Sequence, residues 1–241
     1  MSARLLEVCV ADAASLHAAV AGGADRIELC CALELGGLTP SPGLIRLAST
    51  ASLPVLALVR PRSGDFVYGS GDIEVMLADI AAIRSAGLAG VVLGASQIDG
   101  RLDAETLGIL LKAAGGLAVT LHRAFDLVPD IAEATEIAIA LGFERILTSG
   151  GARTAPEGIS GLKATLAAAR GRIGVMAGSG VDAGNVAALL RAVPVDEVHS
   201  SCSAPQRMQA QAAVALGFAA ASRRQTQAGS VAALKQAMAG L

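Results

Sequence analysis

The chain repeats one short unit, in which an amphipathic helix is followed by a glycine turn and a run of aliphatic residues. Three clear copies lie at 19–29, 83–94 and 138–148. A glycine just after a helix suits the left-handed conformation that ends it. Short aliphatic runs are typical of strands that are buried on both faces. The repeat therefore predicts an α/β fold with a parallel sheet.

The same pattern can be followed along the whole sequence. It predicts eight strands, near residues 5–10, 26–29, 55–59, 90–93, 118–122, 145–148, 173–177 and 197–200. Helices are expected at 13–21, 42–52, 73–86, 104–113, 131–141, 159–169 and 186–192. The tail at 206–241 also has a helical pattern, with an irregular break at 223–229, and would complete the structure.

Eight strands alternating with eight helices predict a single (β/α)8 TIM barrel over residues 1–241. A doubly wound open sheet is the alternative, but its first strand–helix turn normally carries glycines that bind a dinucleotide. The corresponding turn here, Val10-Ala11-Asp12-Ala13, has none. No linker or low-complexity stretch divides the chain.

Composition narrows the class of protein. Hydrophobic residues make up 53% of the 241 residues, but aromatic residues only 2%, so the core must be aliphatic. The net charge is −2 and the basic residues are scattered, which argues against nucleic-acid binding. The sequence shows no membrane span and no signal peptide, so we expect a cytoplasmic protein whose four cysteines are free thiols.

An acid–thiol pair occurs in each of the first two predicted strands. Glu7 and Cys9 alternate with apolar residues, and so do Glu28 and Cys30, so the members of each pair share a face. Each cysteine taken singly is often a small apolar filler. Their matched position on adjacent strands favours a shared site, which would be either a reactive site or a soft-metal site with Cys9 and Cys30 as ligands.

Polar side chains gather at the carboxyl ends of the predicted strands, where barrel enzymes carry out their chemistry. Glu28 or His122 would act as a general base, and Asp126 would orient a partner. A small anion would be held by arginines, strand-end polar groups and a glycine turn: Arg60, Arg62, Arg123, Ser149, Gly178, Ser179, Gly180 and His199. Because buried charges need partners, we also expect Glu28 to pair with Arg60 or Arg123.

Long ordered motifs identify the chain as similar to the CutC family. They are Leu6-Glu7-Val8-Cys9, Gly22 to Cys30, Gly36 to Ser41, Arg60 to Tyr68, Thr120 to Asp126, Arg145 to Gly151, Met176 to Val181 and Glu197 to Ser201. The resemblance runs to about Ser203. It implies a (β/α)8 barrel, a cytoplasmic location and a role in copper homeostasis. It also implies Cu(I) binding, with Cys9 and Cys30 at the positions of the family's proposed copper cysteines.

Two functions from different classes therefore stay open, beside a non-catalytic scaffold. The first is intracellular Cu(I) binding through strand-end thiols. The second is an enzyme acting on a small anionic substrate, a phosphate or a carboxylate, in the pocket of arginine, histidine and glutamate side chains. The Ala-rich tail after Gln206 would either close the barrel or bury a face in a homodimer.

Overall fold

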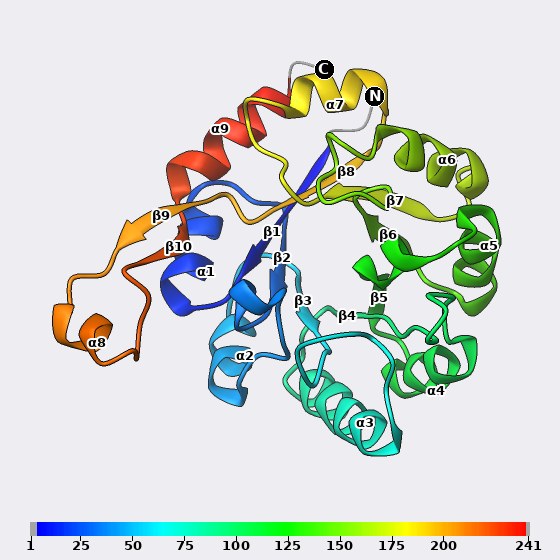
Figure 1. The fold of residues 1–241 in the computed structure, drawn as a ribbon, viewed down its shortest axis with the longest axis horizontal. Helices are drawn as coiled ribbons and strands as arrows, with labels where there is room; N and C mark the ends of the chain where they lie inside the picture. Colours follow the sequence, from blue (N-terminus) through cyan, green and yellow to red (C-terminus); the bar gives the residue numbers. More distant parts are fainter. Residues whose placement is uncertain (1–3, 240–241) are drawn as a thin grey trace.

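The computed structural model describes residues 4–239, and its centre is a closed barrel of eight parallel strands (Figure 1). The strands follow the chain order around the barrel, and β1 pairs with β8 to close it. Their bounds are β1 Leu5–Val10, β2 Arg26–Leu29, β3 Val55–Leu58, β4 Gly90–Leu93, β5 Ala118–Leu121, β6 Arg145–Thr148, β7 Gly174–Gly178 and β8 Glu197–Ser200. The predicted (β/α)8 barrel is confirmed, with strand ends displaced by one residue at most.

Helices surround the barrel on its outer side (Figure 1). They are α1 Ala13–Ala21, α2 Pro42–Ala48, α3 Ser70–Ser85, α4 Ala104–Ala114, α5 Ile131–Leu141, α6 Ile159–Ala169, α7 Val186–Ala192 and α9 Ala228–Ala239. Two short 3-10 helices, η1 Leu33–Leu35 and η2 Arg123–Leu127, follow β2 and β5. Within residues 4–239 no helix is long and apolar enough to cross a membrane.

Local sequence explains where the helices begin and end. Side chains before the first turn accept backbone N–H groups that would otherwise lack partners, and they belong to Asp12, Ser41, Asp103 and Asp130. Helix α2 ends at Ala48, four residues earlier than predicted. Its end is fixed because the hydroxyls of Ser49 and Thr50 donate back to the carbonyls of Arg46 and Leu47.

The tail is only partly helical, so that part of the prediction is wrong. Strand β9 (Ser203–Arg207) pairs antiparallel with β10 (Ser222–Thr226), and the short helix α8 (Gln211–Ala215) lies between them. This arm projects from one side of the barrel in Figure 1. The final helix, α9, packs between α7 and α1 and occupies the last place in the helical ring.

The barrel has a large apolar core outside the strands and a small one inside. Leu6, Val8 and Val10 of β1 face the helices, whereas the inner cluster consists of four buried residues, Cys30, Leu56, Leu58 and Val92. Arg26 lies inside near the amino end of the strands, where it forms ion pairs with Glu7 and Glu197. These charged side chains fill the barrel at the amino ends of the strands, whereas a cavity lies at the carboxyl ends.

Candidate functional site

A cavity of about 780 Å³ opens at the carboxyl ends of the strands. Nine of the residues expected to form a site line it: Cys9, Glu28, Cys30, Arg60, His122, Arg123, Ser179, Gly180 and His199. Four others do not line it, namely Arg62, Asp126, Ser149 and Gly178. The structure therefore brings the thiols, both histidines and two of the three expected arginines around one space.

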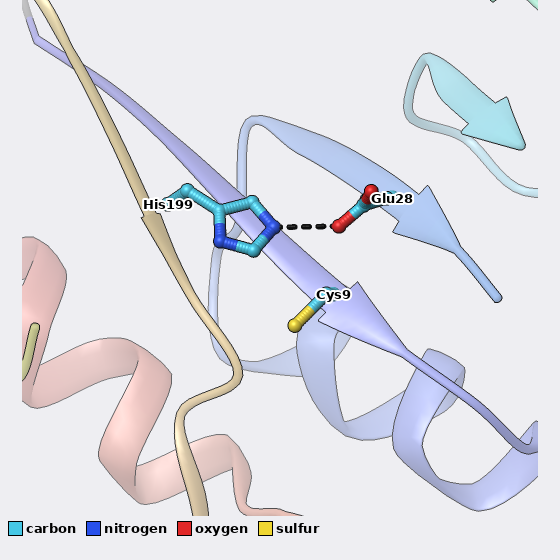
Figure 2. A group of neighbouring side chains, drawn as sticks. All are labelled: Cys9, Glu28 and His199. Carbon is cyan, nitrogen blue, oxygen red and sulfur yellow. Dashed lines mark hydrogen bonds and ion pairs between the residues drawn. The ribbon is translucent and has the colours of Figure 1, made fainter. Parts of the chain in front are cut away.

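Three buried side chains form a compact group at one side of this cavity (Figure 2). The sulfur of Cys9, a carboxylate oxygen of Glu28 and a ring nitrogen of His199 all lie within 4.8 Å of one another. They come from β1, β2 and β8, which are neighbours because β8 closes the barrel against β1. It is the one group of this kind found in residues 4–239.

The register of the strands explains why Cys30 does not belong to this group. Cys9 pairs with Glu28, and Glu7 pairs with Arg26, so β2 is displaced by two residues relative to the predicted match. Such a displacement is the stagger that closing a barrel requires. The prediction that Cys9 and Cys30 lie at matched positions is therefore wrong. The thiol of Cys30 donates to the carbonyl of Val10 at 3.3 Å.

The imidazole of His199 interacts with both other members of the group, and they favour its protonated form. Its Nε2 lies 2.6 Å from Oε2 of Glu28. Burial opposes protonation of the ring, but Cys9 and Glu28 outweigh it and raise the pKa of His199 well above its usual value. Burial also raises the pKa of the Cys30 thiol, with Cys9 and Glu28 adding to the rise. A thiol that keeps its proton is a poor metal ligand, which disfavours Cys30 in that role.

Arg60 lines the cavity after β3, and its partners are neutral. Its guanidinium donates to the carbonyls of Leu35 and Gly37 at 2.9 Å and to that of Gly64 at 2.7 Å. It also lies 4.9 Å from the centre of the Phe66 ring. The expected ion pair of Glu28 with Arg60 or Arg123 is not formed, because Glu28 pairs with His199.

Tyr68 is buried close to this arginine. Burial raises the pKa of its phenol to about 12, although the nearby guanidinium of Arg60 opposes the rise. The phenol therefore stays neutral and does not supply the counter-charge that Arg60 lacks.

His122, which follows β5, is a neutral imidazole. Its Nδ1 accepts the backbone N–H of Ala124 at 3.1 Å, so the ring proton is placed on Nε2. Burial lowers the pKa of His122 to about 4. The ring packs against Phe66 at a centroid distance of 4.7 Å. His122 Nε2 is buried and has no hydrogen-bond partner among residues 4–239.

Two expected site residues support loops instead of facing the cavity. Asp126 accepts the Thr148 hydroxyl at 2.5 Å and the backbone N–H groups of Ser149 and Gly151 at 3.0 Å. It also pairs with Arg123 at 2.7 Å, which positions that arginine. The hydroxyl of Ser149 is 2.5 Å from the carbonyl of Ala152, so it closes the same loop.

Arg62 lies outside the cavity because two carboxylates hold it elsewhere. Its guanidinium pairs with Asp72 at 3.0 Å and with Asp65 at 3.1 Å, and it donates to the carbonyl of Val67. The side chain is 39% exposed. Arg62, although it lies in the same motif as Arg60, is thus a surface residue whose charge is paired with carboxylates.

The glycine turn after β7 is less suited to an anion than the sequence predicts. Ser179 and Gly180 line the cavity, both with positive φ. The loop also brings the carboxylate of Asp182 to the cavity, where it accepts the N–H groups of Gly184 and Asn185. A carboxylate therefore already occupies the donors next to this turn.

Residues of the tail, for which the sequence predicts no role in a site, complete the wall of the cavity. Arg224 of β10 and Leu234 of α9 line the cavity. Arg224 is held to Ser203 of the paired strand, at 3.0 Å between Nε and Oγ. The polar run at 222–226 has no apolar alternation, so no signal in the sequence could have placed this strand or its arginine.

The sequence is similar to those of known proteins. The model of the CutC family matches residues 4–204. A CutC family protein of Sinorhizobium medicae is 57% identical over 241 residues, covering 100% of this chain and 98% of the relative. One from Caulobacter vibrioides is 54% identical over 201 residues, covering 83% and 82% of the two chains.

Solved structures agree with the sequence relatives. A CutC crystal structure from Streptococcus agalactiae superposes with a TM-score of 0.79 at 32% identity, covering 82% of this chain and 98% of that chain. Thiamine phosphate pyrophosphorylase from Pyrococcus furiosus, at 15% identity and a TM-score of 0.59, covers 98% of this chain and 95% of its own. That second likeness shows the barrel fold alone.

Fold and site together define a (β/α)8-barrel protein with a thiol, an imidazole and a carboxylate in the cavity at the carboxyl ends of its strands. The chain belongs to the CutC family, as its sequence motifs predict. The family match ends at residue 204, so β10 and α9, which help to line the cavity, lie beyond it.

Proposed function

We propose that this protein binds Cu(I) inside the barrel and acts in copper homeostasis. The observation that carries the proposal is the group of Cys9, Glu28 and His199, whose ligand atoms lie within 4.8 Å of one another. The Streptococcus agalactiae relative bears the provisional name copper homeostasis protein CutC, which supports the same role.

The donor set fits copper better than it fits a hard cation. A thiolate is the preferred ligand of Cu(I), and an imidazole suits copper as well. Magnesium and calcium prefer oxygen ligands, of which this group offers only the carboxylate of Glu28. In this proposal Cys9 and His199 bind the ion, which displaces the proton that His199 otherwise keeps, and Glu28 holds the imidazole through its 2.6 Å contact with Nε2.

Cys30 has a weaker part in this arrangement than the sequence predicts. It lines the cavity but lies outside the compact group, and its thiol is occupied by the carbonyl of Val10. A two-thiol site with Cys9 would require the Cys30 side chain to leave that carbonyl and lose its proton.

The test is a Cu(I) titration of the reduced protein against a competing chelator. We expect Cys9→Ser to weaken Cu(I) binding at least a hundredfold and His199→Asn at least tenfold. The loss of affinity in Cys30→Ser should be smaller than either. Cys31→Ser is the matched control, because that thiol donates to the carbonyl of Thr39 and does not line the cavity.

The titrations distinguish a thiol–imidazole site from a two-thiol site. Equal losses in Cys9→Ser and Cys30→Ser would replace the thiol–imidazole site with a two-thiol site. Binding that survives Cys9→Ser unchanged would overturn the proposal. The cytoplasmic location and the homodimer stay predictions of the sequence.

A further inference from the structure

We propose that the cavity also binds a small organic anion, whose carboxylate or phosphate group is held by Arg60 and His122. These residues follow β3 and β5, whereas the group of Cys9, Glu28 and His199 is centred on β1. In an eight-stranded barrel β5 lies opposite β1, so His122 and Cys9 line the cavity from opposite sides.

The charge of Arg60 is the first argument. Arg26 and Arg60 are equally buried, with 6% and 5% of their surfaces exposed. Arg26 is held between the carboxylates of Glu7 and Glu197. Arg60, in contrast, makes no ion pair in residues 4–239, and its hydrogen bonds go to neutral carbonyls. A buried charge without a counter-charge is costly, so a counter-anion is expected from outside the chain.

The proton on His122 is the second argument. Because Nδ1 accepts the N–H of Ala124, Nε2 carries the hydrogen and acts as a donor. That donor is buried without an acceptor in the part of the chain described. Phe66 contacts both the guanidinium of Arg60 and the ring of His122, so one aromatic side chain positions the two groups. A cation and a neutral donor held together suit an oxyanion.

The size and charge of the cavity give the third argument. A volume of about 780 Å³ falls in the range of roughly 300–1,000 Å³ that small-molecule sites occupy, and far exceeds the need of one metal ion. Three arginines line it (Arg60, Arg123 and Arg224) against the carboxylates of Glu28 and Asp182. Arg123 is balanced by Asp126, but Arg60 and Arg224 form no ion pair with a carboxylate in residues 4–239.

The experiment is calorimetric titration of the full-length, reduced and metal-free protein with inorganic phosphate and, separately, with malonate. We expect saturable binding of at least one probe, and the preferred probe tells a phosphate from a carboxylate ligand. Arg60→Gln should weaken binding at least tenfold. Arg62→Gln is the matched control and should change it less than twofold, because Arg62 pairs with Asp65 and Asp72 outside the cavity.

A second variant keeps the test decisive if Arg60→Gln fails to fold. His122→Asn retains an acceptor for the N–H of Ala124 and removes the Nε2 donor, so it should weaken binding three- to tenfold. Absence of saturable binding of both probes would overturn the inference, and so would equal binding in Arg60→Gln and the parent protein. Neither result bears on copper, because the protein is metal-free throughout.

Discussion

At the scale of single residues, His122 links the site to the stability of the fold. Its pKa is about 4 in the folded protein, because burial disfavours the charged ring, against 6.5 for the ordinary side chain. Below pH 6.5 the His122 ring becomes protonated in the unfolded chain but stays neutral in the folded protein. Stability is therefore lost as the pH falls from about 6.5 to about 4, by roughly 3 kcal/mol in total.

The variant His122→Asn should flatten this part of the pH profile. Asparagine keeps an acceptor for the N–H of Ala124 but has no proton to gain. Urea unfolding between pH 7 and pH 4, in buffers free of polyvalent anions, measures the difference between the two profiles. His17→Asn, at an exposed position of α1, should leave the slope of the parent protein intact. Parallel profiles for His122→Asn and the parent would contradict the assignment.

Arg26 supports the barrel below the cavity, and its loss should be severe. Arg26→Met removes the partner of Glu7, which is fully buried, and one partner of Glu197. Leaving a buried charge unpaired costs about 3–5 kcal/mol. The free energy of unfolding in urea measures this loss. In Arg172→Met, which breaks an exposed pair with Glu136, the change should be small by comparison.

At the scale of elements, Asp126 joins η2 to the loop after β6. Its carboxylate accepts the hydroxyl of Thr148 and the N–H groups of Ser149 and Gly151. Asp126→Asn replaces one acceptor oxygen by a donor and removes the charge, so we expect a loss of about 1.5–3 kcal/mol. Faster amide exchange at residues 149–152 would show that the loop has loosened.

Asp130→Asn provides the matched control for that change. Asp130 caps α5 through the N–H groups of Ala132 and Glu133, and asparagine caps a helix about as well as aspartate. Equal losses in the two variants would mean that Asp126 has no special supporting role. An unaltered loop in Asp126→Asn would return Asp126 to the set of candidate catalytic residues.

Elements were predictable from the sequence where side-chain pattern alone determines them. Aliphatic runs, most of them after a turn with glycine or proline, located all eight strands, because buried strands need apolar residues on both faces. The strand β10 (Ser222–Thr226) was missed, since it forms by pairing with β9 and has no apolar pattern of its own. Alternation also placed Cys9 and Cys30 inside the barrel, but the stagger that separates them belongs to the closed sheet.

At the scale of the whole molecule, ring closure depends on the last helix. Helix α9 packs between α7 and α1, far from both in the sequence. Lys235 on α9 forms an ion pair with Asp25, which also accepts the N–H of Leu6 at the start of the barrel. The segment beyond the family match is therefore tied to the barrel, and Leu234 reaches the cavity from it.

Gly22 lets α9 approach α1 closely. A Cβ at this position would lie 2.5 Å from Cβ of Val231 and 2.6 Å from the carbonyl oxygen of Ala228. The backbone of Gly22 has φ −81°, which alanine adopts freely, so Gly22→Ala tests the contact alone. We expect a loss of about 1–3 kcal/mol from overpacking, measured by urea unfolding, with faster amide exchange in α9.

Gly108→Ala is the opposite case within the same ring. A Cβ there meets no atom within 4 Å, so alanine should stabilise α4 by about 0.5–1 kcal/mol. Opposite signs for these two glycine-to-alanine changes would show that packing of α9 limits the stability of the ring. If Gly22→Ala were also stabilising, α9 would have to lie away from α1 in solution, and Leu234 could not form a wall of the cavity.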